Sequence, residues 1–318
     1  MFFDFAMITV GLVILVFAGD ALVKGAVNLS LRLGVPALIV GLTVVAFGTS
    51  APELLVSVEA VLGNAPALAL GNIVGSNIAN ILLVLGVPAL IAAVPVSRDL
   101  MHDYIMMMVA TFGFILLAFL GPFSWPHGVA LLLGLAFMLW NSYARARNHR
   151  NDVAASVDDG EVDLEGADPG ISGTKIALYL AGGIIGLPIG ANFLVDGAVN
   201  VATALGVSEA VIGLTLVAVG TSLPELATTV AAALRREAGV AMGNVIGSNL
   251  FNLLAIIGIA SFIGDIPVPE EMLLLDLWVM AGSGALLGVF VYTGRRINRL
   301  TGIGLIALYV LYVIQLFH

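Results

Sequence analysis

The sequence contains no cysteine and few charged residues. Without cysteine the chain can form neither a disulfide framework nor a thiolate metal site. Charged residues make up 10% of the 318 residues, against about 25% in soluble domains, while hydrophobic residues make up 60%. The four histidines lie at the ends of apolar runs or in connections, so no histidine metal site is expected. This composition excludes an ordinary soluble domain and predicts an all-α polytopic membrane protein.

Ten apolar runs are long enough to cross about 30 Å of hydrocarbon. They lie at about 3–29, 37–62, 65–92, 101–120, 126–144, 174–202, 209–234, 239–264, 271–292 and 299–317. Gly-Pro or charged turns separate several of these runs. We therefore predict ten transmembrane helices.

An unusual polar interruption occurs twice, at an offset of 172 residues. The segment from Gly41 to Glu53 matches the segment from Gly213 to Glu225 at 10 of 13 positions. A second block, GNIVGSNIAN over 71–80, returns at the same offset as GNVIGSNLFN over 243–252. Duplicated polar blocks within apolar spans are typical of transporters that are built from two repeats and bind their substrate between them.

The repeats must cross the membrane in opposite directions, because five spans is an odd number. We predict a first five-span repeat over 1–144, an acidic linker over 145–173 and a second, inverted five-span repeat over 174–318. The acids of the linker do not follow the spacing of an EF-hand loop, so a flexible cytoplasmic connection is preferred there over a regulatory cation site.

The positive charges predict the orientation of the chain. Except for Lys24, all Lys and Arg residues lie in or beside the connections between spans 1–2, 3–4, 5–6, 7–8 and 9–10. The opposite side has none. The positive-inside rule then places both termini outside and the central loop in the cytoplasm, in a multi-pass protein of the plasma or inner membrane.

A proline and a glutamate follow Gly-Thr-Ser in the middle of spans 2 and 7. Pro52 and Pro224 lack an N–H and should break their helices, which predicts unwound backbone with free carbonyls inside the bundle. The candidate carbonyl ligands are those of Ala46, Thr49, Ala218 and Thr221. Glu53 and Glu225 are central, duplicated carboxylates, which are costly in hydrocarbon unless they have a function. Together they match the charge of one Ca²⁺.

Spans 3 and 8 add hydroxyl and amide oxygens. Their polar positions repeat every four residues and share one helix face: Asn72, Ser76 and Asn80, then Asn244, Ser248 and Asn252. Oxygen ligands of these kinds suit Ca²⁺ and Na⁺. We favour ion ligation for Ser50, Ser76, Ser222 and Ser248, and leave open whether Asn72, Asn77, Asn244 and Asn249 bind ions or pack and cap helices.

These blocks resemble the two α-repeats of the cation/calcium antiporter superfamily, in particular those of prokaryotic sodium/calcium exchangers. The matching motifs are GTSAPE at 48–53 with GSNIAN at 75–80, and GTSLPE at 220–225 with GSNLFN at 247–252. The resemblance implies that Glu53 and Glu225 bind Ca²⁺ and share it with Na⁺ sites, with the carbonyls of Thr49 and Thr221 completing the calcium site. The glutamates themselves also take part in the Na⁺ sites. The resemblance further implies flanking Na⁺ ligands at Ala46, Ser50, Ser76, Ala218, Ser222 and Ser248 and a central ligand at Asn80.

One position distinguishes this chain within that family. Some members, including potassium-dependent exchangers, have Asp where this chain has Asn252, so the chain is more similar to the potassium-independent branch. Asn also leaves proton coupling to the two glutamates alone.

The sequence therefore predicts a transporter, not an enzyme, with Ca²⁺ and Na⁺ as transported substrates and no cofactor. We expect alternating-access antiport of Na⁺ against Ca²⁺ by a monomer. The alternatives are H⁺/Ca²⁺ antiport and, less favoured, a cation channel, because channels usually surround their pore with identical subunits.

Overall fold

The computed structural model describes residues 2–155, 170–205 and 218–316, and every regular element in these ranges is a helix. The first half contains α1 (Phe2–Leu33), α2 (Ala37–Val40), η1 (Gly41–Val45), α3 (Ala46–Thr49), α4 (Ala51–Leu62), α5 (Pro66–Leu82), α6 (Gly86–Ile91), η2 (Arg98–Leu100), α7 (Met101–Phe119) and α8 (Trp125–Ala155). The second half contains α9 (Gly173–Ala204), α11 (Ala218–Thr221), α12 (Leu223–Leu234), α13 (Ala238–Phe251), η4 (Asn252–Ile256), α14 (Ile257–Ile263), η5 (Met272–Asp276), α15 (Leu277–Thr293) and α16 (Arg299–Gln315).

These helices fall on the ten predicted spans, and the all-α polytopic fold is confirmed. Seven helices are long and apolar enough to cross a membrane, and the bent pair 37–49 and 51–62 makes an eighth. The shorter apolar helices α12 and α16 occupy the two remaining spans. The first part of span 7 lies outside the described residues, and α8 continues to Ala155, beyond the predicted end of its span at 144.

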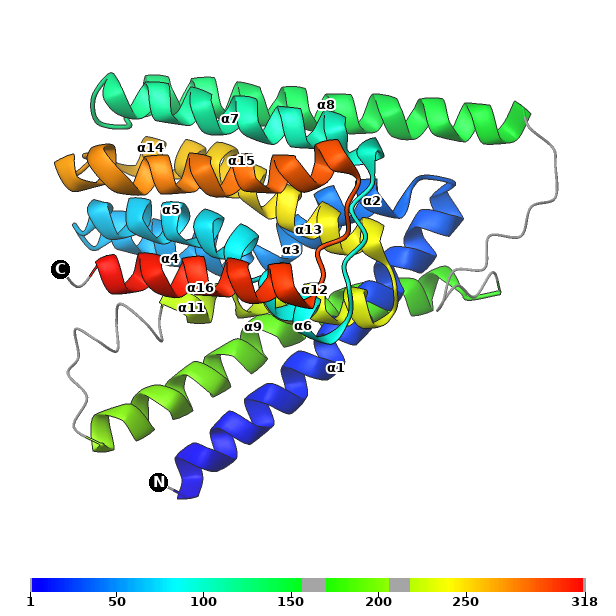
Figure 1. The fold of residues 1–318 in the computed structure, drawn as a ribbon, viewed down its shortest axis with the longest axis horizontal. Coiled ribbons are helices and arrows are strands. Elements are labelled where there is room, and N and C mark those ends of the chain that lie inside the picture. The colour runs from blue at the N-terminus through cyan, green and yellow to red at the C-terminus, as the bar shows by residue number, and fades with distance from the viewer. Residues whose placement is uncertain (1, 156–169, 206–217, 317–318) are drawn as a thin grey trace.

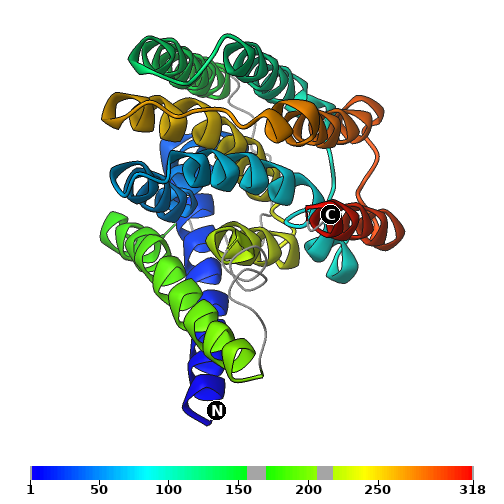
Figure 2. The same cartoon turned by 90° about the vertical axis from the view of Figure 1, so that its left-hand side faces the viewer.

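The helices form stacked layers that α1 and α9 cross obliquely on one side (Figures 1 and 2). α1 and α9 pack against each other in opposite directions. A methyl group added to Gly11 would lie 2.5 Å from the backbone of Leu194, and one added to Gly183 would lie 2.5 Å from the side chain of Leu22. Adding 172 to the residue numbers of one contact gives the residues of the other, as expected for inverted repeats. Glycine at these positions allows the two helices to approach this closely.

Connections from different repeats meet at two places. Val94 pairs with Ile297 through two backbone hydrogen bonds of 2.9 Å, and the Arg98 side chain donates to the Tyr292 carbonyl nearby. Phe123 pairs in the same way with Ile266. The first junction joins the cation-bearing connections 3–4 and 9–10, while the second joins connections 4–5 and 8–9, so each junction holds loops that the sequence assigns to one side of the membrane.

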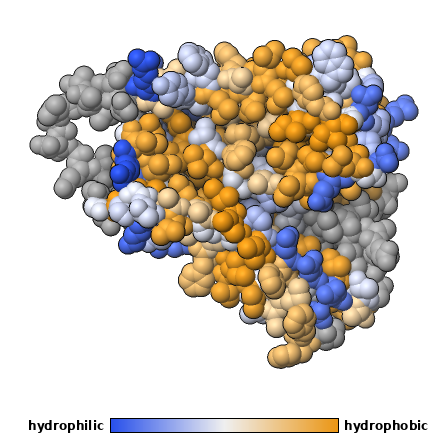
Figure 3. All heavy atoms as spheres, turned by 180° about the vertical axis from the view of Figure 1, so that it is seen from behind, coloured by the Kyte–Doolittle hydropathy of each residue, from blue (hydrophilic) through white to orange (hydrophobic). Residues whose placement is uncertain are grey.

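The outer surface fits a hydrocarbon environment. Large hydrophobic side chains such as Leu116, Trp140, Ile185 and Leu274 are more than half exposed. Figure 3 shows hydrophobic residues over most of one face, with hydrophilic residues mainly toward its two lateral margins. Exposed apolar area on this scale indicates contact with lipid.

A buried ion pair fastens α7 to α8. Asp103 is 0% exposed and binds the guanidinium group of Arg145, whose Nη1 lies 3.0 Å from Oδ2, while the side chain of Arg145 is 28% exposed. Arg147, two residues further along α8 and on another face of the helix, is exposed. Removal of one partner from such a pair leaves a buried charge without compensation.

We predict that Arg145→Met destabilises the protein and that Arg147→Met does not. The first substitution should lower the free energy of unfolding by about 3 kcal/mol, because it leaves the Asp103 carboxylate buried and unpaired. Thermal unfolding of both variants in detergent, followed by circular dichroism, measures the difference. Equal melting temperatures for the two variants would show that the pair contributes nothing to stability.

Candidate cation-binding site

The two predicted helix breaks lie at Ser50 and Ser222. Ser50 has φ −83° and ψ 4°, and Ser222 has φ −85° and ψ 3°, so the two repeats share the same local backbone. At Ser50 the chain bends by 43° between α3 and α4. Each break is a single non-helical residue, shorter than the unwound segment that the sequence suggested. Because the proline stands in the first turn of the following helix, its missing N–H costs little there.

The carbonyl of Ala46 is not free, contrary to the sequence expectation. It accepts hydrogen bonds from the Ser50 N–H at 3.0 Å and from the Thr49 hydroxyl at 3.3 Å. Pro52 instead leaves the carbonyl of Gly48 without its usual helical donor. In the second break the Ser222 N–H donates to Val219 at 3.1 Å, a tighter turn than at Ser50. Ala218 and Thr221 form the ends of the short helix α11 that precedes this turn.

Glu53 and Glu225 lie in the first turns of α4 and α12 and are both 0% exposed. A helix N-terminus is a favourable place for negative charge. Oε1 of Glu225 accepts from the Ser50 hydroxyl at 3.2 Å and from the Ser248 hydroxyl at 3.4 Å. These bonds join the first repeat's break to two elements of the second repeat.

Most of the buried oxygen atoms without a protein partner belong to the predicted ion ligands, including these carboxylates. Within the described residues, ten buried side-chain nitrogen or oxygen atoms have no hydrogen-bond partner, and seven belong to predicted ion ligands. The seven are both carboxylate oxygens of Glu53, one of Glu225, the hydroxyls of Ser76 and Ser222, and the amide oxygens of Asn80 and Asn252. A buried polar atom without a partner is costly, and a set made only of oxygen atoms is what a bound cation would satisfy.

The threonine next to each helix break is hydrogen-bonded to an asparagine of the other repeat. The Thr49 hydroxyl donates to the amide oxygen of Asn244 at 3.0 Å, and the Thr221 hydroxyl donates to that of Asn72 at 3.2 Å. The amide groups in turn donate to Thr229 at 3.1 Å and to Ser57 at 3.4 Å. Thr49 also lies 3.3 Å from the Ser248 hydroxyl.

For Asn72 and Asn244, which the sequence left open between ion binding and packing, the structure shows packing contacts. Their oxygens bind the threonine hydroxyls of the other repeat, which fixes each break against its pseudo-symmetric neighbour. Sequence reasoning missed Ser57 and Thr229, the acceptors of these amides. The constant offset of 172 could have paired these two hydroxyl residues, although one is Ser and the other Thr.

The helices of spans 3 and 8 each contain a wider turn, with a hydrogen bond that reaches back five residues, next to Asn80 and Asn252. Asn252 begins the π-helical turn η4, and in span 3 the Val84 N–H reaches back five residues to the Ala79 carbonyl at 2.9 Å. Such wide turns are common at functional sites because they redirect side chains within a helix.

The donor set points to a hard cation. Carboxylate, hydroxyl, amide and carbonyl oxygens are the ligands of Na⁺ and Ca²⁺. Among the described residues there is no cluster of three or more His, Cys, Asp or Glu side chains, so a transition-metal site has no support there. Both glutamates are closed off from solvent, so an ion could reach them only after a rearrangement of helices.

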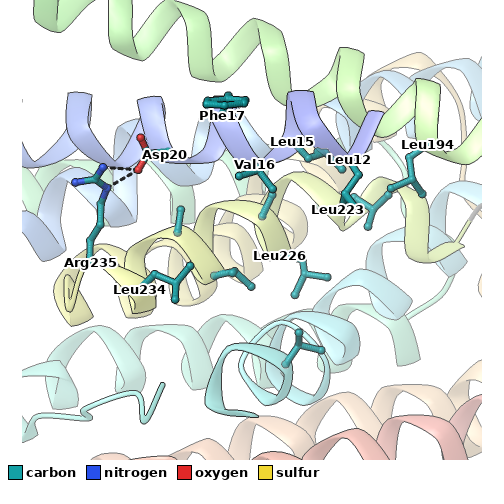
Figure 4. A pocket seen from close by; sticks show the side chains of 14 residues that line it. Leu12, Leu15, Val16, Phe17, Asp20, Leu194, Leu223, Leu226, Leu234 and Arg235 are labelled. Carbon is teal, nitrogen blue, oxygen red and sulfur yellow. Dashed lines mark hydrogen bonds and ion pairs between the residues drawn. The ribbon is translucent and has the colours of Figure 1, made fainter. Parts of the chain in front are cut away.

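A separate cavity of about 510 Å³ lies between α1 and α12 and is lined mainly by apolar side chains such as Leu15, Val16 and Leu226 (Figure 4). Among its described lining residues only Asp20 carries a carboxylate, which provides too few oxygen atoms for the coordination shell of a cation. At one end Asp20 accepts from Nε of Arg235 at 2.6 Å and from Nζ of Lys24 at 2.9 Å. This ion pair joins α1 to the C-terminal end of α12.

Comparison with known proteins gives one consistent family. The family model described as sodium/calcium exchanger protein matches residues 3–144 and 175–317. The chain is 35% identical to the sodium/calcium exchanger MaX1 of Methanosarcina acetivorans over 99% of both chains. It is 36% identical to the inner membrane protein YrbG of Escherichia coli, over 81% of this chain and 79% of the relative.

The same relationship holds in three dimensions. The structure superimposes on the sodium-calcium exchanger NCX_Mj with a TM-score of 0.82 and 32% identity over 99% of both chains. The two halves matched by the family model and this likeness establish the ten-helix fold of inverted repeats. On both sequence and structure, the chain belongs to the sodium/calcium exchanger family of membrane cation transporters.

Proposed function

We propose that this protein is a secondary active antiporter that exchanges Na⁺ for Ca²⁺ by alternating access. The observation that carries the proposal is the set of buried, unpartnered oxygens from both repeats, which includes those of two enclosed carboxylates. The sodium/calcium exchangers MaX1 and NCX_Mj support the choice of ions by their similarity over the full length.

In this proposal the central site binds one Ca²⁺ through Glu53 and Glu225. The carbonyls of Thr49 and Thr221 and the amide oxygen of Asn80 complete it. Flanking Na⁺ sites use the groups of Ser50, Ser76, Ser222, Ser248, Ala46, Ala218 and Asn252. The Ala46 carbonyl would share its lone pairs with two existing hydrogen bonds, so we expect it to be the weakest of these ligands.

Charge neutrality links the two ions. The carboxylates supply two negative charges, which match one Ca²⁺ or two Na⁺. Since both ions need the same carboxylates, occupancy by one excludes the other. A cycle that carries three Na⁺ against one Ca²⁺ would move one net charge and would therefore be electrogenic.

Proton-driven exchange is the second candidate. It is favoured by the two buried carboxylates, which could exchange Ca²⁺ for protons. Asn252 argues for Na⁺, because it removes a titratable group that some family members have at this position. A channel is least favoured, because both carboxylates are 0% exposed.

Alternating access requires α1 and α9 to move across the layered helices. Because glycines let α1 and α9 pack closely against each other, the two helices could move as a pair. Their oblique crossing of the other helices supports this division (Figure 1). The Asp20–Arg235 ion pair tethers α1 to α12 and would have to break during such a movement.

We further propose that both termini face outward, that the central acidic loop over 145–173 is cytoplasmic, and that the protein lies in the cell membrane as a functional monomer. The charge distribution supports the orientation. Both repeats contribute to one site within one chain, which supports the monomer.

Cysteines placed at Asn64 and Glu270 should label from outside and one at Ser156 only from inside; outside labelling at Ser156 would reverse the orientation.

Proteoliposomes test the function directly. ⁴⁵Ca²⁺ uptake should follow an outward Na⁺ gradient at constant pH, and should respond to membrane potential because the cycle moves a net charge. Uptake driven only by a pH gradient would favour the proton alternative. Uptake that follows neither gradient would contradict antiport.

In the same assay we predict that Glu53→Gln and Glu225→Gln abolish exchange to similar extents. Each substitution keeps side-chain volume but removes one charge that offsets the dehydration of Ca²⁺. The uptake rate should fall by more than about tenfold, since the lost contact is worth more than about 1.4 kcal/mol. The double variant should be little worse than either single variant, as for residues that act as one unit. Near wild-type exchange by either single variant would rule out the paired-carboxylate site.

For the tether, we predict that Arg235→Gln speeds exchange by roughly twofold to fivefold, because a partly exposed ion pair contributes up to about 1 kcal/mol to the state that contains it. Arg236→Gln is the matched control, since Arg236 is exposed and adjacent. Initial rates at saturating Ca²⁺ give the comparison. Identical rates for the two variants would mean that the Asp20–Arg235 pair does not restrain α1.

A further inference from the structure

Four buried asparagines are linked by hydrogen bonds between the two repeats. They are Asn77 and Asn80 on α5 and their counterparts at the 172-residue offset, Asn249 on α13 and Asn252 on η4. We call these four residues the asparagine belt. Each is at most 3% exposed. The proposed function uses only two of them as ligands.

Two bonds of the belt are related by the pseudo-twofold symmetry. The amide nitrogen of Asn80 donates to the side-chain oxygen of Asn249 at 3.0 Å. The amide nitrogen of Asn252 donates to the side-chain oxygen of Asn77, also at 3.0 Å. In both cases the opposite end of the donating amide is an oxygen that has no protein partner. Each bond therefore turns one amide so that its oxygen is the atom left for an ion.

The accepting asparagines are themselves held in one orientation. The amide nitrogen of Asn77 donates to the Asn249 carbonyl at 3.3 Å and points at the Met280 sulfur at 3.8 Å. The amide nitrogen of Asn249 points at the Met107 sulfur at 3.7 Å. A thioether sulfur and a carbonyl can accept hydrogen bonds but cannot donate them. A flip of Asn77 would therefore set its oxygen against two acceptors.

We infer that Asn77 and Asn249 are positioning residues of the cation site, which present the oxygens of Asn252 and Asn80 to the ion and exclude a third carboxylate from position 252. The inference rests on the proposed function, because it takes Asn80 and Asn252 as ligands. The exclusion follows from the 3.0 Å contact. An ionised aspartate at 252 would face the Asn77 oxygen with no proton between two buried acceptors.

The consequence is a fixed charge at the site. With amides at positions 80 and 252, Glu53 and Glu225 remain its only negative groups among the described ligands. The asparagine belt thus keeps the negative charge of the site at that of the two glutamates, and this charge sets how many Na⁺ replace one Ca²⁺. A cation would meet the negative end of each amide dipole and never the N–H end.

The first test measures equilibrium ⁴⁵Ca²⁺ binding to purified protein in detergent. Asn77→Leu and Asn249→Leu remove the acceptors at nearly constant volume, and each should raise the Ca²⁺ dissociation constant by about tenfold, equivalent to about 1.4 kcal/mol. Asn28→Leu is the matched control: Asn28 is also buried, but its amide donates to the Lys24 carbonyl of its own helix. Wild-type affinity in both belt variants, or an equal loss in all three variants, would overturn the inference.

The second test does not depend on the folding of the leucine variants. Simple electrostatics predicts that Asn252→Asp binds Ca²⁺ more tightly, because it adds a negative charge. The belt predicts weaker binding by Asn252→Asp, and recovery in the double variant Asn77→Ser, Asn252→Asp, because a serine hydroxyl can donate to the carboxylate. Tighter binding by Asn252→Asp, or no recovery in the double variant, would contradict the inference.

The two proposals fail in different ways. If the wild-type protein binds no Ca²⁺ at low Na⁺ concentration and also none at low proton concentration, the proposed function is wrong. If it binds Ca²⁺ and the belt variants behave as the control does, the function stands and only the positioning role of Asn77 and Asn249 is lost.

Discussion

The rest of the structure depends on the cost of two carboxylates buried inside a membrane protein. Glu53 and Glu225 are fully enclosed, and no Lys or Arg among the described residues pairs with either of them. Charge in such a place is tolerated only where something compensates it. Helix N-termini favour both carboxylates, and two serine hydroxyls donate to that of Glu225. The unpartnered oxygens that remain are best satisfied by a cation, which couples the stability of the site to its occupancy.

Inverted duplication explains how one short motif builds this site. Two kinds of contact appear twice, and all four bonds cross between repeats: Thr49 with Asn244, Thr221 with Asn72, Asn80 with Asn249, and Asn252 with Asn77. The threonine hydroxyl of each break is thus held by an asparagine of the other repeat. The duplication therefore makes the core rigid, while the separate, glycine-packed pair α1 and α9 remains the part best suited to move.

The sequence predicted the ten spans and the inversion, and it proposed a candidate site because proline, glutamate and asparagine are conspicuous in apolar helices. It did not predict geometry that depends on contacts across the repeats. The break at Ser50 is one residue long because Pro52 fits the first turn of α4, and the Ala46 carbonyl is bonded where it was expected to be free. Nor could the spacing alone separate ligands from supports: Asn72 and Asn80 share a helix face, yet only Asn80 has a free oxygen.

The central claim is that Na⁺ and Ca²⁺ compete for one site built on two shared carboxylates. Equilibrium displacement of ⁴⁵Ca²⁺ from the purified protein by increasing Na⁺ tests it most directly, with choline at equal ionic strength as the control cation. The account predicts complete displacement by Na⁺ with a Hill coefficient above one, because more than one Na⁺ replaces each Ca²⁺, and no displacement by choline. Ca²⁺ that stays bound at saturating Na⁺ would contradict it.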